Sequence, residues 1–362
     1  MTAANAEERV LAEDTARRWL EQHCDLKAVL AVAEDANGAG HPAQVWRAAA
    51  DMGWLGTLIP EKYGGLGLSL ADAVTVLRAL GSGVMPGPYL ATMLAAEAIR
   101  LGGTAAQQAR LLPDIAAGRV VATVAGARLD ELDITAGSGG KLSGACGAVA
   151  YASLAQILVV PVRNGAATNL WLVDAKGPGV TVAPCQSVDG TWRVGFVTLH
   201  GAPGERLEGD PDAWWRFIRH GAVLTAADQL GLAGRALDIT VDYVKLREQF
   251  GRPVGANQGV KHPLAEVYVA ITMARKGLFH AADALERRER DAFMSASVAK
   301  AKCNDAARDA TAAMIQFHGA IGFTWPHPAH LFFKRAKRQE YEFGDSTWHR
   351  ERVADHWLKE TA

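Results

Sequence analysis

Apolar residues recur at helical spacing in the first third of the chain. The segments ADAVTVLRAL (71–80) and MLAAEAIRL (93–101) place apolar side chains three and four residues apart, which predicts helices with one buried face. The intervening segment PEKYGGLGLS (60–69) contains Pro60 and a run of glycines, so it cannot continue a helix. The pattern predicts an N-terminal helical domain over residues 1–118.

The pattern changes between residues 119 and 208. Short β-branched runs separated by Gly, Asn, Asp or Pro follow one another: RVVATVAGA, ILVVPV, NLWLVDA, VTVAPC and WRVGFVTLHG. Because no helical segment separates these runs, a parallel dinucleotide-binding sheet is disfavoured, and GSGGKLSG from Gly137 is interpreted as a turn rather than a phosphate loop. We expect a central antiparallel β domain, a barrel or a sandwich.

Helical periodicity returns from residue 209 to 362. Two very long segments, 213–250 and 262–319, are separated by Gly251, Pro253 and Gly255, and a further break follows at 319–328. The pattern predicts a C-terminal four-helix bundle. The fold class is therefore predicted to be α+β, mainly α, in the order helical domain, β domain, helical bundle.

Composition and charge exclude several classes of protein. Of 362 residues, 49% are hydrophobic and 21% charged, which is typical of a globular protein and excludes disorder over most of the chain. Lys+Arg 38 against Asp+Glu 39 leaves a formal charge of -1, so no nucleic-acid partner is expected. The most apolar stretch, from Ala152, is interrupted by Pro161 and Arg163, so no membrane span is expected. The acidic N-terminal segment has no signal-peptide pattern, and a cytoplasmic location is expected.

The cysteines predict neither a metal site nor a disulfide framework. Cys24, Cys146, Cys185 and Cys303 are scattered along the chain, without the close pairs that metal sites use. We expect reduced thiols in the core and no metal.

Three motifs resemble one known family, the flavin-dependent acyl-CoA dehydrogenases. The segment LREQFGRPVGANQGVKHPLA (246–265) is similar to that family's RxQFGxPIxxFQxxxHxLA. QFHGAIGFTWPHPAHLFFKRAK (316–337) resembles QxHGGxGFTxExPxxRxxRDA, and PEKYGGLGLS resembles PExYGGxGL. The motifs occur in the family's order across nearly the whole chain, which makes the resemblance specific.

The resemblance implies an FAD bound between two subunits of a dimer within a tetramer. Arg247 would meet the diphosphate of a flavin held mostly by the neighbouring subunit, Gln249, Phe250 and Gln258 would line that site, and Gln316 with the backbone of Gly319 and Ala320 would approach the ADP portion. A guanidinium forms bidentate, charge-assisted bonds to phosphate, which suits Arg247. The alternatives are a solvated arginine at a helix end and, for Gly319, a plain helix C-cap.

The resemblance also implies a reaction that needs a catalytic base, and neither of the two positions expected for that base holds a carboxylate here. In the family a carboxylate removes the α-proton of an acyl-CoA while a hydride passes from the β-carbon to the flavin. The two positions that supply this carboxylate in different branches are Phe343 and Gly221 here. An alignment with one inserted residue makes Glu342 the candidate base. The alternative is that Glu342 is solvated or paired with the basic run 334–338.

The chain's own flavin pocket departs from the family as well. ATVAGARLDELD (122–133) lacks the family's Thr-Glu-Pro and the following Gly-Ser. Ala148, Val149 and Ala150 stand where an aromatic cluster beside the flavin ring is expected. The motifs that contact a neighbouring subunit's flavin are thus present, whereas those that this chain needs to bind its own flavin are missing. This pattern resembles the paired α2β2 acyl-CoA dehydrogenases of actinobacterial sterol side-chain catabolism.

The leading hypothesis is therefore a supporting subunit of a heteromeric FAD-dependent acyl-CoA dehydrogenase, with an acyl-CoA substrate, a second dehydrogenase subunit and an electron-transfer flavoprotein as acceptor. Small residues at Gly221, Ala222 and Ala226 favour a bulky or steroid-derived acyl group, unless they only permit close helix packing. A second hypothesis is a self-sufficient homotetramer with Glu342 as base. A third is a non-catalytic structural partner, which Arg247, Gln249 and Gln316 argue against.

Overall fold

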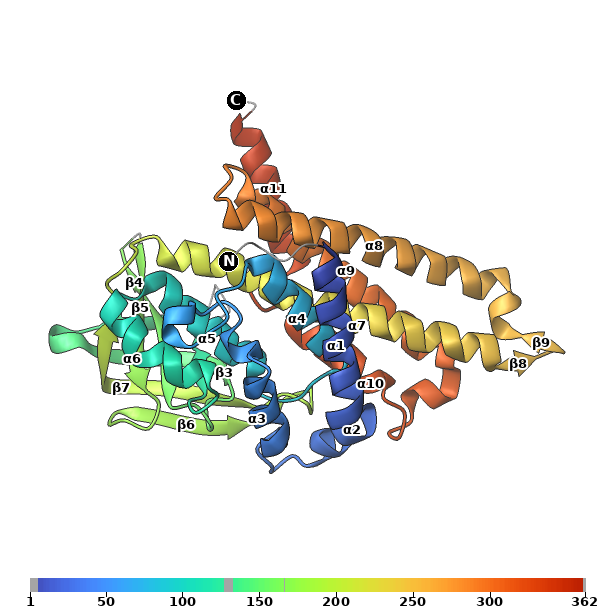
Figure 1. The fold of residues 1–362 in the computed structure, drawn as a ribbon, viewed down its shortest axis with the longest axis horizontal. Coiled ribbons are helices and arrows are strands. Elements are labelled where there is room, and N and C mark those ends of the chain that lie inside the picture. Colours follow the sequence, from blue (N-terminus) through green and yellow to red (C-terminus); the bar gives the residue numbers. More distant parts are fainter. Residues whose placement is uncertain (1–5, 127–132, 166, 361–362) are drawn as a thin grey trace. The chain divides into compact units, whose positions relative to one another are not determined.

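The computed structural model describes residues 6–126, 133–165 and 167–360, and Figure 1 draws their helices and strands. Contacts group the described residues into two compact units. Unit 1 comprises residues 32–73 and 86–221, and unit 2 comprises residues 6–31, 74–85 and 222–360. Three helices contribute to both units: α2 (Leu26–Glu34), α4 (Leu70–Ser82) and α7 (Ala213–Leu246).

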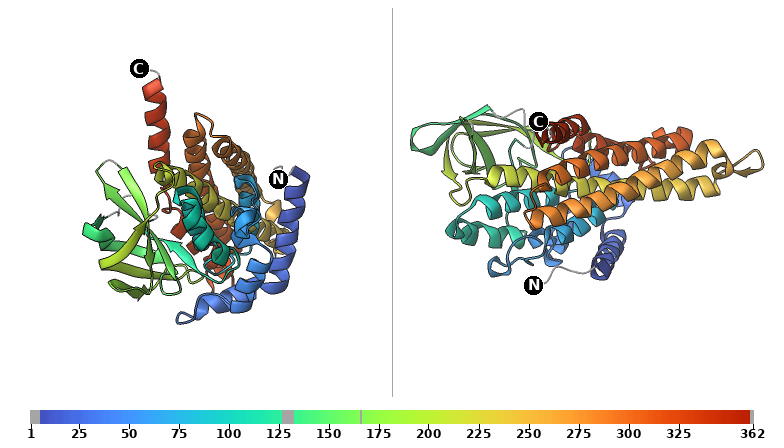
Figure 2. Two further views of the ribbon diagram at one scale, coloured as in Figure 1. Left: turned by 60° about the vertical axis from the view of Figure 1, so that its left-hand side comes forward. Right: turned by 90° about the horizontal axis from the view of Figure 1, so that it is seen from above.

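A seven-stranded sheet forms the centre of unit 1. Its order is β1-β4-β5-β7-β3-β2, with β6 paired to β7. β1 and β4 are parallel, and the other pairs are antiparallel, as Figure 2 allows the reader to follow in green. The strands are β1 (Ala122–Val124), β2 (Asp133–Ala136), β3 (Lys141–Ala150), β4 (Ile157–Asn164), β5 (Ala167–Asp174), β6 (Val180–Cys185) and β7 (Val194–Arg206).

Side chains from most of these strands share one core. Buried members include Leu142, Val149, Leu158, Val160 and Leu199. The helices and 3-10 turns of unit 1 are α3 (Ala43–Asp51), η1 (Trp54–Gly56), η2 (Glu61–Tyr63), α5 (Tyr89–Gly102), α6 (Ala105–Ala116) and η3 (Ser138–Gly140). Of these, α5 packs against β1 and β4.

Unit 2 is a helical bundle organised around α9 (Ala292–His318). This helix packs against α8 (Gln258–Glu286), α10 (Ala329–Gln339) and α11 (Ser346–Glu360). Alanines on α9 such as Ala299, Ala306 and Ala310 are fully or almost fully buried, so the helices approach one another closely. The remaining elements are α1 (Ala6–His23), β8 (Glu248–Gln249), β9 (Arg252–Pro253), η4 (Val254–Ala256) and η5 (Gly319–Phe323).

Glycine permits the closest contact in unit 2, between α4 and α7. A Cβ at Gly231 would lie 1.8 Å from the carbonyl oxygen of Arg78, and one at Gly81 would lie 2.1 Å from that of Asp228. No other residue fits at either position without moving a helix, because both obstacles are backbone atoms.

The predicted fold class, α+β and mainly α, is confirmed, although the sheet is mixed through its one parallel pair. All five β-branched runs contain strands. Unit 2 combines residues from both predicted helical regions, and the division into three domains stays a prediction.

Two details of the sequence analysis were wrong. Neither β2 nor β3 was among the predicted strands, and the helical segment 262–319 is divided into α8 and α9 by a break at residues 287–291. The break lies within the charged run ERRERD (286–291), in which Arg288 adopts a φ of 54°.

The cysteines are free thiols. Cys24, Cys146 and Cys303 are buried, and burial raises their pKa values to about 11, 12 and 12. Among the described residues, no helix combines the length and apolarity that crossing a membrane requires, and no group of three His, Cys, Asp or Glu side chains is arranged to hold a metal.

Candidate functional site

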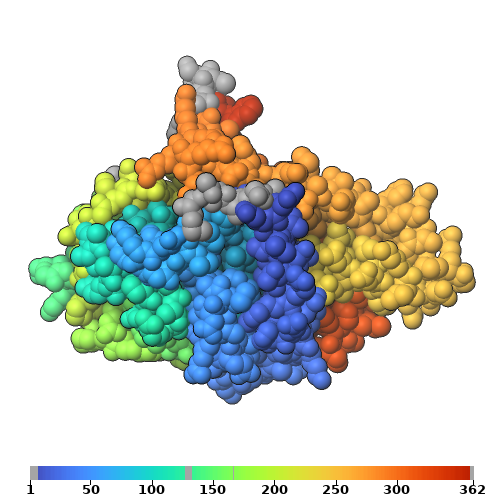
Figure 3. All heavy atoms as spheres, viewed as in Figure 1, coloured from blue at the N-terminus to red at the C-terminus, as the bar shows by residue number. Residues whose placement is uncertain are grey.

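The first candidate segment is a tight hairpin at the end of α7. β8 and β9 pair Gln249 with Arg252, so Phe250 and Gly251 are the two central residues of the turn. Both have positive φ, 52° and 75°, which matches the type I′ turn of two-residue hairpins. Such a φ is unusual for an aromatic residue, and the Phe250 side chain is fully exposed. Figure 3 shows this hairpin, in yellow-orange, at the molecular surface.

The backbone of Arg247 is hydrogen-bonded, whereas its side chain has no partner among the described residues. Its N–H donates to the Tyr243 carbonyl and its own carbonyl accepts from the Val254 N–H, both at 2.8 Å. Its exposed guanidinium makes no hydrogen bond or ion pair within the described part of the chain. By contrast, Arg252 in the same hairpin donates to the Asn257 side chain.

The other hairpin candidates are exposed too. The Gln249 side-chain amide donates to the Glu248 carbonyl at 2.7 Å. Gln258 is the first residue of α8, and its side chain is exposed.

The second candidate segment is the end of α9. Gln316 is exposed, and Gly319 terminates the helix with φ 62° and an N–H that bonds to the Gln316 carbonyl. A Cβ added at Gly319 would meet nothing within 4 Å, and Ala320 is exposed. The backbone here is therefore open to a ligand or a partner, while Gly319 also serves as the helix C-cap.

An aromatic contact links the two segments. The ring of Tyr243, one turn before Arg247, stacks on that of His318 with centroids 4.3 Å apart and planes at 25°. His318 lies two residues after Gln316. The structure thus brings the end of α7, one turn before Arg247, against the end of α9, two residues after Gln316.

The segment after α10 carries the candidate base. Glu342 forms an ion pair with Arg338, one turn earlier, and its side chain is about one-fifth exposed (21%). Phe343, at the aligned base position, is buried and has a φ of 57°. The Phe343 carbonyl lies 2.9 Å from Nε2 of His349, and burial, together with the Lys300 charge, lowers the pKa of His349 to about 3. The neutral imidazole therefore donates its Nε2–H to that carbonyl.

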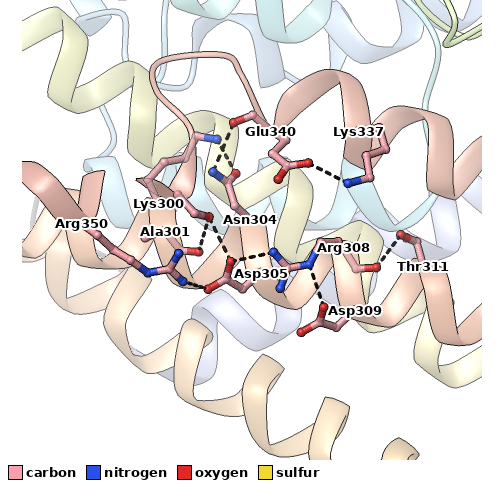
Figure 4. A network of polar contacts seen from close by, with 11 residues as sticks. Lys300, Ala301, Asn304, Asp305, Arg308, Asp309, Thr311, Lys337, Glu340 and Arg350 are labelled. Carbon is pink, nitrogen blue, oxygen red and sulfur yellow. Dashed lines mark hydrogen bonds and ion pairs between the residues drawn. The ribbon is translucent and has the colours of Figure 1, made fainter. Parts of the chain in front are cut away.

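A buried lysine, which the sequence analysis did not single out, anchors the same segment to α9. Lys300 Nζ donates to the Asn304 side chain at 2.6 Å, to Gln229 at 3.2 Å and to the Gln339 carbonyl, at the end of α10, at 3.1 Å. Asn304 in turn donates to the Glu340 carbonyl at 3.3 Å, as Figure 4 shows. Burial lowers the pKa of Lys300 to about 7, against the opposing effect of Glu342.

Gly221, the other position expected for the base, is buried. It directly follows His220, which pairs with Glu97 in unit 1. His220 Nδ1 lies 2.7 Å from the Glu97 carboxylate, which also accepts two bonds from Arg100, at 2.6 and 2.7 Å. Burial raises the pKa of Glu97, but Arg100 and His220 outweigh it and lower the pKa to about 2. The only sequence signal for this cluster was a Glu within the apolar helix MLAAEAIRL.

The elements of the chain's own flavin pocket lie on the sheet. Residues 127–132 of the segment that lacks Thr-Glu-Pro lie outside the described residues. On β3, Val149 is buried in the sheet core, and Ala148 is exposed opposite Phe196 of β7.

Comparison with known proteins identifies the family. The family model for the acyl-CoA dehydrogenase N-terminal domain matches residues 6–119, and that for the C-terminal domain matches residues 209–358. Together these matches cover most of the chain, so it belongs to the acyl-CoA dehydrogenases, a family of FAD-dependent enzymes.

Similar relatives point to one branch of this family. The chain is 33% identical to acyl-CoA dehydrogenase IpdE2 of Mycobacterium tuberculosis, with 91% of each chain covered. A solved structure of the Tcur3481-Tcur3483 steroid ACAD G363A variant matches with a TM-score of 0.90 and 31% identity, covering 98% of this chain and 99% of the other. The ChsE4-ChsE5 complex from Mycobacterium tuberculosis also matches with a TM-score of 0.90, at 27% identity and 99% coverage of both chains.

Proposed function

We propose that the chain is the supporting subunit of a heteromeric acyl-CoA dehydrogenase, which introduces an α,β double bond into an acyl-CoA thioester. One observation carries the proposal. An uncommitted guanidinium at Arg247 is combined with Phe343 and Gly221 at both base positions. The chain thus has the residues that a neighbour's flavin site needs, and it has no carboxylate at either position expected for the catalytic base.

The residues present fit an FAD held jointly with a partner. Arg247 would bind the diphosphate, because an unpaired guanidinium offers bidentate donors to phosphate. Gln249, Phe250 and Gln258 would line the site. Gln316 and the backbone of Gly319 and Ala320 would meet the ADP portion, where the absence of a Cβ at Gly319 keeps the backbone accessible. When bound, FAD supplies the acceptor for the hydride from the substrate β-carbon.

Exposed apolar side chains on α8 support an assembled state. Tyr268, Val269 and Met273 are each more than half exposed. Beside them a groove of about 840 Å³ runs between α7 and α8; its lining includes Leu237, Val241 and Leu264 together with charged side chains such as Asp238 and Lys245. Exposed apolar side chains beside such a groove are typical of protein–protein contacts. The relatives solved as the ChsE4-ChsE5 complex and as Tcur3481-Tcur3483 support a second acyl-CoA dehydrogenase chain as the partner.

A steroid-derived acyl-CoA is the proposed substrate class, supported by the similarity to a steroid ACAD. The small residues on α7 add nothing to this, because Ala222 and Ala226 are buried and fit close helix packing equally well. The ratio of kcat/KM for a steroid side-chain thioester to that for butyryl-CoA measures the preference. An electron-transfer flavoprotein is the proposed electron acceptor.

The proposed function assigns the base to the partner, and Glu342→Gln tests this. Arg338 already pairs with Glu342, so the substitution should leave turnover of the assembled enzyme within a few-fold of wild type. A positioned general base contributes about 10²–10⁴-fold, so a loss of that size would identify Glu342 as the base and favour the self-sufficient homotetramer. Glu340→Gln is the matched control, because Glu340 forms a comparable ion pair with Lys337.

A further inference from the structure

Three rings lie in contact at the ends of α7 and α9 and just before α10. Tyr243 stacks on His318, and His318 lies against His327 with centroids 4.5 Å apart and planes at 48°. His318 is buried, with Nδ1 2.7 Å from the Met314 carbonyl. His327 Nδ1 accepts from the Ala329 N–H, at the first residue of α10, at 3.2 Å. Each ring is thereby fixed to a different helix end.

Tyr243 and His318 each lie next to one of the two segments proposed to contact FAD. The Tyr243 carbonyl accepts the N–H of Arg247 at 2.8 Å. His318 is the last residue of α9, two residues after Gln316 and directly before Gly319, and the Gly319 N–H closes the helix onto the Gln316 carbonyl. The Tyr243–His318 contact therefore joins the backbone that leads into Arg247 to the 316–320 segment.

We propose that Tyr243 and His318 are positioning residues whose stacked rings set the separation between Arg247 and the 316–320 segment, and thereby the affinity of this half-site for a dinucleotide flavin. The inference rests on the proposed function. Neither side chain needs to touch the flavin, because each acts through the backbone of the segment that follows it.

The neutral state of His318 and His327 supports ring contacts rather than ion pairs between these side chains and their neighbours. Burial lowers the pKa of His318, although its bond to the Met314 carbonyl opposes this. Burial and the charges of His318 and His330 lower the pKa of His327. Both rings are therefore neutral at pH 7, and a neutral imidazole stacks on a phenol through its face.

A double-mutant cycle tests the proposal on the FAD-loaded assembly that the full chain forms, alone or with its partner. The dissociation constant for FAD is measured by flavin fluorescence for Tyr243→Leu, Tyr243→Phe, Arg247→Ala and the Tyr243→Leu/Arg247→Ala double variant. Tyr243→Leu should weaken FAD binding about two- to tenfold, the range expected for one aromatic pair. Tyr243→Phe keeps the ring and should stay within twofold of wild type.

Non-additivity distinguishes positioning from general stabilisation. If Tyr243 acts through Arg247, Tyr243→Leu should lose most of its effect once Arg247 is Ala. Full additivity, or equal losses in Tyr243→Phe and Tyr243→Leu, would overturn the proposal. An unchanged FAD affinity in Arg247→Ala alone would instead contradict the proposed function. If Tyr243→Leu yields no folded assembly, Tyr243→Met supplies the non-aromatic arm with an unbranched side chain.

Discussion

Arg247 differs from its neighbours in what its side chain has left to bind. Its backbone is held at both ends, by Tyr243 and by Val254, while its guanidinium has no partner among the described residues. An exposed guanidinium without a partner among these residues is what the proposed contact to a flavin diphosphate requires.

Replacing Arg247 with Ala should weaken FAD retention by the assembled enzyme about tenfold or more, because a charge-assisted hydrogen bond contributes roughly 1.5–3 kcal/mol. The melting temperature should change little, since the side chain is exposed and unpaired. The FAD content after gel filtration and the dissociation constant from back-titration measure the effect.

Arg252→Ala is the matched control for this substitution. Arg252 lies in the same hairpin and is also exposed, but its guanidinium donates a hydrogen bond to the Asn257 side chain. Its loss should therefore leave FAD content near wild type. Equal effects of the two substitutions would mean that only the general positive charge of the hairpin matters.

At the scale of elements, α9 holds the segment that follows α10. Lys300 and Asn304 bind the carbonyls of Gln339 and Glu340, and Ser346, the first residue of α11, donates to Asp305 at 3.0 Å. Arg350 of α11 pairs with the same aspartate, as Figure 4 shows. The candidate base segment is thus clamped on both sides, which favours a fixed structural role over a mobile catalytic one.

The buried Lys300 predicts a specific dependence of stability on pH. Its folded-state pKa of about 7 lies below the ordinary 10.5, so between these values the unfolded chain binds more protons than the folded one. The Lys300 contribution to the free energy of unfolding should therefore rise with pH from about 7 towards 10.5, and it is smallest below pH 7. Lys300→Met should remove this component, as measured by urea unfolding at pH 7 and pH 9.

Lys302→Met provides the comparison, because Lys302 lies on the same helix with its side chain exposed. It should keep the wild-type pH dependence. A Lys300→Met curve parallel to that of wild type would show that Lys300 stays protonated in the fold.

Helical and β elements differed in how far the sequence predicted them. Periodicity predicted helices in both units, because their apolar side chains recur at helical spacing, even in α5, which is buried at nearly every position. β3 was missed because its glycines read as turn signals. In the fold Gly144 adopts a φ of 134° between two register shifts of the β3–β7 pair, and a Cβ there would lie 2.0 Å from the Asp133 carbonyl oxygen.

The candidate site was predictable only where a motif named it. Arg247, Gln249 and Gln316 came from the resemblance, and the structure adds the Tyr243–His318 contact that brings two of these segments together. Lys300 carried no signal, since a lysine in an alanine-rich helix is usually exposed. Burial of such a residue depends on the helices that pack around it, which no local pattern reports.

At the scale of the whole molecule, the proposed function gives the chain one half of a flavin site, at the hairpin and the α9 end, and assigns the other half to the partner. The hairpin and the α9 end expose polar and aromatic groups that have little use in an isolated chain. On β3, the positions expected to hold an aromatic cluster are Ala148, Val149 and Ala150, and Val149 is committed to the sheet core. A symmetric homo-oligomer would repeat the same deficiency in each of its flavin sites, whereas a partner with an intact β domain would supply what is missing.

This asymmetry predicts the flavin stoichiometry. The chain expressed alone should retain little FAD, and co-expression with an acyl-CoA dehydrogenase paralogue of the same genome should yield a complex with about one FAD per pair of chains, because only the partner's pocket is completed by both subunits. Absorbance at 450 nm against protein concentration, with native mass spectrometry for the subunit ratio, measures both numbers. A yellow homotetramer with one FAD per chain would contradict the supporting role, and it would mean that residues of this chain's own β domain hold the flavin without the Thr-Glu-Pro motif. A colourless complex of the expected subunit ratio would instead favour the purely structural partner, with Arg247 reduced to a surface charge.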